Sequence, residues 1–134
     1  MGIKLVIVDD APFIREAIRG LIRDTEFEYV GEAIDGEEAV DVIRRLKPDV
    51  VLMDLVMPKK NGIEVTKEIL EEMPKIKIIA CSTEGQTNLT LKALEAGCSH
   101  FLSKPFTAEA LLKVLRTTMS LGSKSKSRPI PHGG

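Results

Sequence analysis

The sequence predicts an α/β protein: a doubly wound, five-stranded parallel sheet of the (βα)5 type with helices on both faces. Short apolar runs alternate five times with segments of helical periodicity, and short connections join them. The 134 residues suffice for one domain of ordinary size. With 43% hydrophobic residues and a formal net charge of −1, the composition is globular and gives no case for general nucleic-acid binding.

These patterns place ten elements along the chain, and each depends on its periodicity or on a signal at its ends. The expected strands are Ile3–Val8, Glu28–Ala33, Val50–Asp54, Ile76–Ala80 (reaching Ser82) and Ser99–Ser103. The expected helices are Pro12–Ile22, Glu37–Leu46, Ile63–Met73, Thr87–Ala96 and Thr107–Met119.

The first half of the chain has clear breaks between its elements. Residues 3–8 are a short apolar run, and Pro12 suits the first turn of the helix that follows. Residues 28–33 alternate like an edge strand, and Asp35-Gly36 separates them from the second helix. Residues 50–53 are all apolar, which is typical of a strand buried on both faces.

Turn and capping residues define the second half in the same way. Asn61-Gly62 is a turn before the third helix, and Pro74 ends that helix. Gly97 suits the left-handed conformation that ends the fourth helix. Lys104-Pro105 breaks the last strand, and Thr107 suits the N-cap of the last helix.

Polar residues follow four of the strands at their carboxyl ends. They are, in chain order, Asp9, Asp10, Asp54, Ser82, Thr83 and Lys104. Ligands of open parallel sheets bind outside this edge, so we expect these side chains to converge there. An unpaired charge inside a buried strand costs several kcal/mol, which favours a position for Asp54 in a crevice, where it can do chemistry.

These residue types together suit a magnesium ion and a phosphoryl group. Three neighbouring carboxylates repel one another unless a cation joins them, and oxygen ligands without His or Cys favour Mg²⁺. An Asp carboxylate is a nucleophile toward phosphoryl groups, while Lys and Ser side chains bind phosphoryl oxygens. The set therefore fits Mg²⁺ and an aspartyl phosphate.

The motifs that carry these residues recur in a fixed order along residues 3–119. They are Val8-Asp9-Asp10, Met53-Asp54-Leu55-Val56-Met57-Pro58, Asn61-Gly62, Ser82, Ala96-Gly97 and Lys104-Pro105-Phe106. These motifs and their order resemble those of the receiver domain of two-component response regulators. Such a receiver domain would occupy residues 1–121. The resemblance implies a flavodoxin-like fold with strand order 2-1-3-4-5. It also implies a switch that takes a phosphoryl group from a sensor histidine kinase or phosphotransfer protein and then binds a downstream protein.

The resemblance implies a role for each matching position of the site. Asp54 would be the phosphorylated residue, Ser82 would donate a hydrogen bond to the phosphoryl group and Lys104 would pair with it. Asp9 would act on the ion mainly through a bound water. The expected Mg²⁺ ligands are Asp9, Asp10, Asp54 and the backbone carbonyl of Val56.

Four further positions concern switching and phosphate lifetime. Phe101 stands where the family has an aromatic switch, which changes the surface formed by the last two helices and the last strand. Val56, Thr83 and Glu84 flank the site and would tune hydrolysis of the acyl phosphate. Thr83 departs from the usual Ala or Gly, and its bulk is expected to narrow access to Asp54. The Lys104-Pro105 bond is typically cis in such receivers.

Other functions remain as alternatives. A Mg²⁺-dependent aspartyl-phosphate phosphatase would resemble this site, but such enzymes have a second acid where Val56 stands. Nucleotide-binding enzymes are disfavoured because neither GxGxxG nor GxxxxGK[ST] occurs. A receiver that works without phosphorylation is disfavoured by the intact Asp10, Asp54 and Lys104. We therefore expect a signalling switch that catalyses its own phosphorylation and dephosphorylation, with no turnover of an external substrate.

Residues 122–134 differ in composition from the rest of the chain. They are rich in Ser, Lys, Pro and Gly, with three basic residues and no acid. This favours a flexible basic tail or linker. It could tether an output domain of a longer regulator, contact an acidic partner or be a non-native extension. The run Asp9-Asp10-Ala11-Pro12-Phe13, by contrast, resembles stand-alone chemotaxis-type receivers.

The cysteines and the N-terminus bear on the compartment. Cys81 and Cys98 are too far apart for a CxxC motif, so we expect two buried, reduced thiols. The sequence has no run long enough for a membrane helix, and its start lacks the features of a signal peptide. A cytoplasmic location is the expectation.

Overall fold

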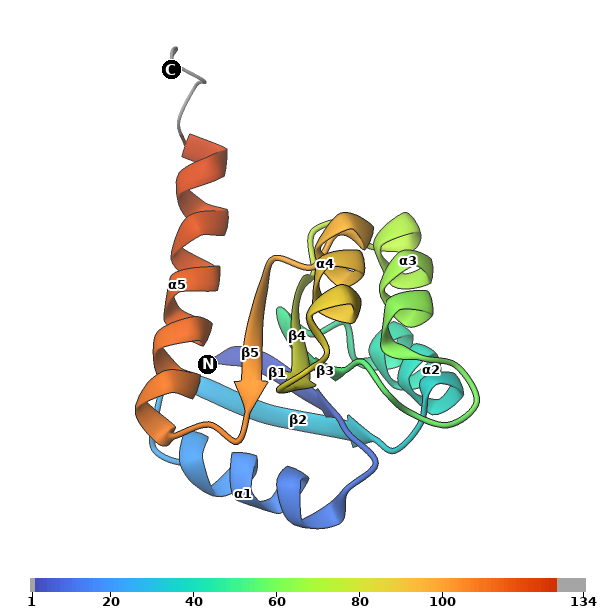
Figure 1. The fold of residues 1–134 in the computed structure, drawn as a ribbon. Helices are drawn as coiled ribbons and strands as arrows, with labels where there is room; N and C mark the ends of the chain where they lie inside the picture. Colours follow the sequence, from blue (N-terminus) through green and yellow to red (C-terminus); the bar gives the residue numbers. More distant parts are fainter. Residues whose placement is uncertain (1, 128–134) are drawn as a thin grey trace.

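The computed structural model describes residues 2–127, which form one five-stranded sheet with five helices (Figure 1). All strand pairs are parallel, and the order across the sheet is β2-β1-β3-β4-β5. The strands are β1 Ile3–Val8, β2 Phe27–Ala33, β3 Val50–Asp54, β4 Lys77–Thr83 and β5 His100–Lys104. The helices are α1 Pro12–Ile22, α2 Gly36–Leu46, α3 Gly62–Glu72, α4 Thr87–Ala96 and α5 Ala108–Ser127. The predicted fold class and strand order are confirmed.

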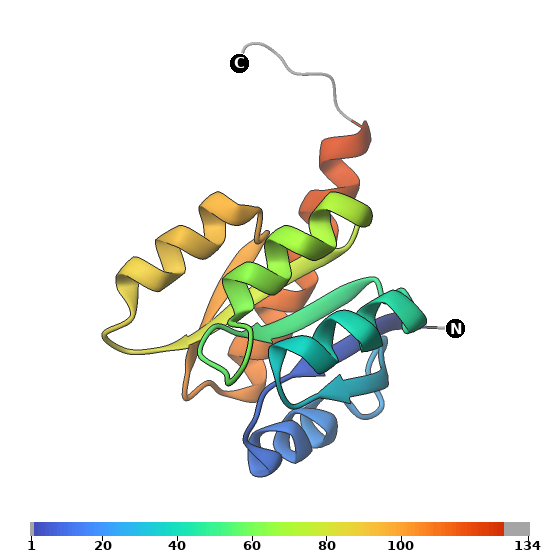
Figure 2. The same cartoon turned by 90° about the vertical axis from the view of Figure 1, so that its right-hand side faces the viewer.

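The sheet separates two apolar layers. Helices α1 and α5 cover one face, and α2, α3 and α4 cover the other (Figures 1 and 2). Successive side chains of a strand point to opposite faces, so Leu5 and Ile7 pack toward α1 and α5 while Val6 and Val8 pack toward α2 and α3. Every residue of β3 is buried, as its continuous apolar run predicts.

Local capping signals fix most helix ends where the sequence places them. Pro12 occupies the first turn of α1, and Thr107 Oγ1 accepts a hydrogen bond from the Ala110 backbone N–H ahead of α5. Asn61 and Glu64 form a capping box at the start of α3. Gly97 ends α4 with φ of 119°, a backbone conformation that L side chains rarely adopt.

The predicted end of α5 is wrong. The helix does not stop at Met119 but continues to Ser127, and it therefore includes residues 122–127 of the predicted tail. Ser and Lys are tolerated in helices, a single Gly costs only about 1 kcal/mol, and no Pro occurs between Ala108 and Pro129. Residues 128–134, the rest of that predicted tail, lie outside the described residues. No helix within residues 2–127 is both long and apolar enough to span a membrane.

Both cysteines are free and buried, as predicted. Burial raises the pKa of the Cys81 thiol to about 12 and that of Cys98 to about 11. At pH 8 the reactive thiolate is then roughly 10⁻³ or less of either residue. We expect neither cysteine to react with a disulfide reagent in the native protein, whereas both react quickly in denaturant. Rapid modification of the native protein would contradict this packing.

Candidate functional site

Three carboxylates meet where β1 and β3 end. These strands are neighbours in the sheet, and Val8 pairs in register with Met53, so the residues that follow them lie side by side. Carboxylate oxygens of Asp9, Asp10 and Asp54 all lie within 4.8 Å of one another. Asp9 and Asp54 are buried, while Asp10 is exposed. The predicted convergence of these acids is therefore present.

Lys104 places a positive charge between two of these acids. It ends β5, and its long side chain extends across the end of β4 to reach them. Its Nζ lies 2.6 Å from Asp9 Oδ2 and 3.5 Å from Asp54 Oδ2. The Lys104-Pro105 peptide bond is cis. Lysine and acids thus form one partly buried charge cluster.

The charges in this cluster shift the pKa of its members. Burial raises the pKa of the Asp54 carboxyl, and the nearby negative charges of Asp9 and Asp10 raise it further. The Lys104 charge and the hydrogen bond from the Val56 N–H lower this pKa but do not outweigh burial. Burial alone would lower the pKa of Lys104, but its bond to Asp9 and the Asp54 charge outweigh burial and raise it. Lys104 therefore stays charged next to the Asp54 carboxyl, whose ionisation burial disfavours.

The connection from β3 to α3 packs tightly against the backbone of Asp54. The Val56 N–H donates to Asp54 Oδ1 at 3.1 Å, while the Val56 side chain is half exposed. A Cβ at Gly62 would lie only 2.4 Å from the Asp54 carbonyl oxygen, so this close approach requires glycine. The loop thereby holds the Asp54 carboxylate in one orientation.

Ser82 belongs to the same sheet edge, but its hydroxyl is engaged elsewhere. Ser82 is buried at the end of β4, and its Oγ lies 2.9 Å from Thr90 Oγ1 on α4. Among the described residues, no hydrogen bond joins Ser82 to Asp54 or Lys104. The expected approach of Ser82 to the acids is thus not made in this conformation.

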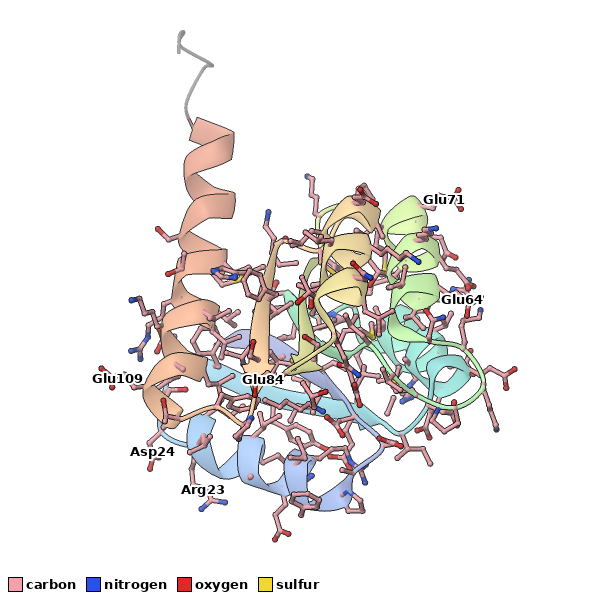
Figure 3. The ribbon with its side chains drawn as sticks, viewed as in Figure 1. Arg23, Asp24, Glu64, Glu71, Glu84 and Glu109 are labelled. Carbon is pink, nitrogen blue, oxygen red and sulfur yellow. The ribbon has the colours of Figure 1, made fainter. Side chains whose placement is uncertain are left out.

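The remaining predicted positions lie on the surface around β4 and β5. Thr83 ends β4 and Glu84 follows it, and both side chains are exposed, with Glu84 at the sheet edge where β4 and β5 end (Figure 3). Phe101 is 43% exposed and lines a cavity of about 300 Å³ between β5 and α4. Its ring is therefore turned outward, with free space beside it.

Two residues near the site were missed by the sequence analysis. Thr90 binds Ser82, and Arg15 binds the backbone carbonyl of Asp9 at 2.7 Å. The signal for Thr90 was present, because it shares helical spacing with Ala93 and Leu94 on the inward face of α4. A hydroxyl that points inward needs a hydrogen-bond partner. The spacing places the Thr90 hydroxyl near the end of β4, where Ser82 lies.

The cluster suits a divalent cation and a phosphoryl group by its donor types. The acids offer only oxygen ligands, which Mg²⁺ prefers, and Mg²⁺ bound by such ligands usually keeps several of its waters. A buried carboxylate beside a lysine is also the arrangement of a phosphoryl acceptor.

The comparison with known proteins identifies the family. A family profile described as "Response regulator receiver domain" matches residues 5–116. The chain belongs to this family. The receiver is 43% identical over 115 residues to "Chemotaxis protein CheY" of Thermotoga maritima, covering 86% of this chain and 96% of that protein. It is also 34% identical to "Transcriptional regulatory protein DegU" of Brevibacillus brevis, but covers only 52% of that protein.

Solved structures agree with this assignment. The REC domain of AraT, a response regulator from Geobacillus stearothermophilus, superposes with a TM-score of 0.85 at 29% identity and covers 95% of this chain and 100% of that one. A LuxR-family two-component response regulator from Aurantimonas sp. gives a TM-score of 0.83 at 32% identity. The match covers 90% of this chain and 86% of that one. The receiver is therefore a phosphoacceptor switch of two-component signalling, and the phosphatase and nucleotide-enzyme alternatives are not favoured.

Proposed function

We propose that Asp54 is the phosphoryl acceptor of this receiver and that a sensor histidine kinase, a phosphotransfer protein or a small phosphodonor supplies the group. The observation that carries the proposal is the position of the Asp54 carboxylate, within 4.8 Å of oxygens of two further acids and 3.5 Å from the Lys104 ammonium. Burial opposes the ionisation of Asp54, and the Val56 N–H orients its carboxylate. Both features are typical of a carboxylate that acts as a nucleophile.

In the transfer, a carboxylate oxygen of Asp54 attacks phosphorus. The new O–P bond forms while the P–N bond of the phosphohistidine breaks, and the departing imidazole keeps the electron pair. The Lys104 Nζ lies 3.5 Å from Asp54 Oδ2, close enough to neutralise part of the negative charge of the transferred phosphoryl oxygens. The residues that would hold Mg²⁺ are Asp9, Asp10, Asp54 and the backbone carbonyl of Val56. The ion, when bound, would neutralise the charge of the acids and of the phosphoryl group.

Loss of the phosphoryl group reverses the switch. Water attacks phosphorus of the acyl phosphate, the O–P bond to Asp54 breaks and phosphate leaves. Val56, Thr83 and Glu84 have exposed side chains and would set the lifetime by controlling how water reaches the acyl phosphate. This is self-dephosphorylation of a switch, without turnover of an external substrate.

The output of the switch is a change of the α4–β5–α5 face. The added charge draws Ser82 toward the phosphoryl group, and Phe101 turns into the cavity beside it. A downstream protein then binds the altered face. Moving a 1:99 equilibrium to 99:1 takes about 5.5 kcal/mol, which sets the scale of the phosphoryl contacts required. We place this in the cytoplasm, a compartment that suits the free thiols of the chain.

Labelling with phosphate tests the acceptor. Incubation with ³²P-acetyl phosphate and Mg²⁺ is expected to label the wild-type protein and leave Asp54→Asn unlabelled, because the amide is no nucleophile. The matched control is Asp41→Asn, an exposed acid of α2, which should label normally. Label that persists in Asp54→Asn would refute the assignment, and steady hydrolysis of a phosphate monoester would favour the phosphatase instead.

A further inference from the structure

The hydroxyl of Ser82 is held by a partner on α4 that the function proposed above does not use. Ser82 Oγ and Thr90 Oγ1 lie 2.9 Å apart, and either atom could donate. A second bond decides the direction. Thr90 Oγ1 also lies 3.2 Å from the Gln86 backbone carbonyl, which has no proton to give, so Thr90 must donate there. Thr90 has one hydroxyl proton, and Ser82 is therefore the donor in the bond between the two hydroxyls.

The proton of Ser82 is thus committed to α4 and points away from the acids. A serine hydroxyl has a single proton, so Ser82 cannot donate to a phosphoryl oxygen on Asp54 while it donates to Thr90. The first turn of α4 is itself well fixed. Gln86 accepts from the Thr90 N–H at 3.0 Å, and its side-chain Oε1 accepts from the Thr83 N–H at 2.8 Å.

We propose that Thr90 is a positioning residue that keeps the receiver in its resting conformation by binding the Ser82 hydroxyl. The inference depends on the proposed function, since it needs a phosphoryl group at Asp54 for Ser82 to turn to. Phosphorylation breaks the Ser82–Thr90 bond and thereby releases α4 from the end of β4. Thr90 couples the phosphorylated edge of the sheet directly to the helix that a partner would bind.

Thr90→Val tests this coupling because valine has the shape of threonine without the hydroxyl. With beryllofluoride as the phosphoryl analogue and Mg²⁺ present, titration calorimetry on the full chain should show about fivefold tighter binding than for the wild type. A fivefold change corresponds to about 1 kcal/mol, the net contribution of one neutral hydrogen bond. Removing the bond raises the fraction of protein that is competent to bind, and the apparent Kd falls by that factor. Thr90→Ser keeps the hydroxyl and should bind like the wild type.

A double-substitution cycle separates this role from a general loosening of α4. In the Ser82→Ala background, Thr90→Val should leave beryllofluoride affinity unchanged, because the bond is already absent. Equal tightening in both backgrounds, or none in either, would overturn the role of Thr90 while leaving Asp54 as acceptor. A wild-type protein that does not bind beryllofluoride would instead overturn the proposed function and, with it, this inference.

Discussion

Lys104→Met is expected to lower the free energy of unfolding by about 3 kcal/mol in Mg²⁺-free buffer at neutral pH. Lys104 is the cation paired with both Asp9 and Asp54, and all three side chains are at most 15% exposed. Methionine keeps the apolar stem but leaves two buried carboxylates facing each other, and removing one partner of a buried ion pair costs about 3–5 kcal/mol. Chemical denaturation with a chelator present measures the loss.

The control for this substitution is Lys113→Met, which changes an exposed lysine of α5. Its effect should stay within about 0.5 kcal/mol, as for most surface positions. If both substitutions cost the same, the pairing of Lys104 with the acids is not what stabilises this edge of the sheet. Adding Mg²⁺ should recover much of the stability lost in Lys104→Met, because the ion supplies the missing positive charge.

Most of the fold was predictable because local and long-range signals agree. The continuous apolar run of β3, the capping residues of α3 and Gly97 at the end of α4 each act within a few residues, and the strand alternation then favours one parallel sheet. The same logic predicted the cluster of Asp9, Asp10, Asp54 and Lys104, since residues at the carboxyl ends of parallel strands share an edge.

Two features escaped prediction, and the first depends on a contact between two elements: helical spacing turns Thr90 inward but does not say which hydroxyl donates. The direction of the Ser82 hydroxyl is decided by Thr90, a partner on another element, and by a bond from Thr90 to its own helix. The end of α5 was missed for a different reason: composition suggested a linker, while helix formation requires only that no residue breaks the hydrogen-bond ladder. Composition is a weak guide where no Pro interrupts a helix that has already formed.

Mg²⁺ is expected to raise the melting temperature by about 5 °C when it is present at ten times its Kd. A ligand that binds only the folded state stabilises it by RT ln(1 + [L]/Kd), here about 1.4 kcal/mol, and a domain of this size gains a few degrees per kcal/mol. The cluster of three carboxylate oxygens within 4.8 Å of one another exists only in the folded chain. The unfolded state should therefore not compete for Mg²⁺.

Variants of the acids show whether this shift comes from the proposed site. Asp10→Asn and Asp54→Asn each remove one charged oxygen ligand and should abolish most of the shift, whereas Asp41→Asn on α2 should keep it. Asp54→Asn should also melt higher than the wild type without Mg²⁺, because it removes a carboxylate whose ionisation burial and two neighbouring acids oppose. Lys104→Met should show a larger Mg²⁺ shift than the wild type, since its acids have lost their internal cation. An equal shift in all of these proteins would mean that the ion binds elsewhere on the chain, and the acids would then need another explanation for lying so close together.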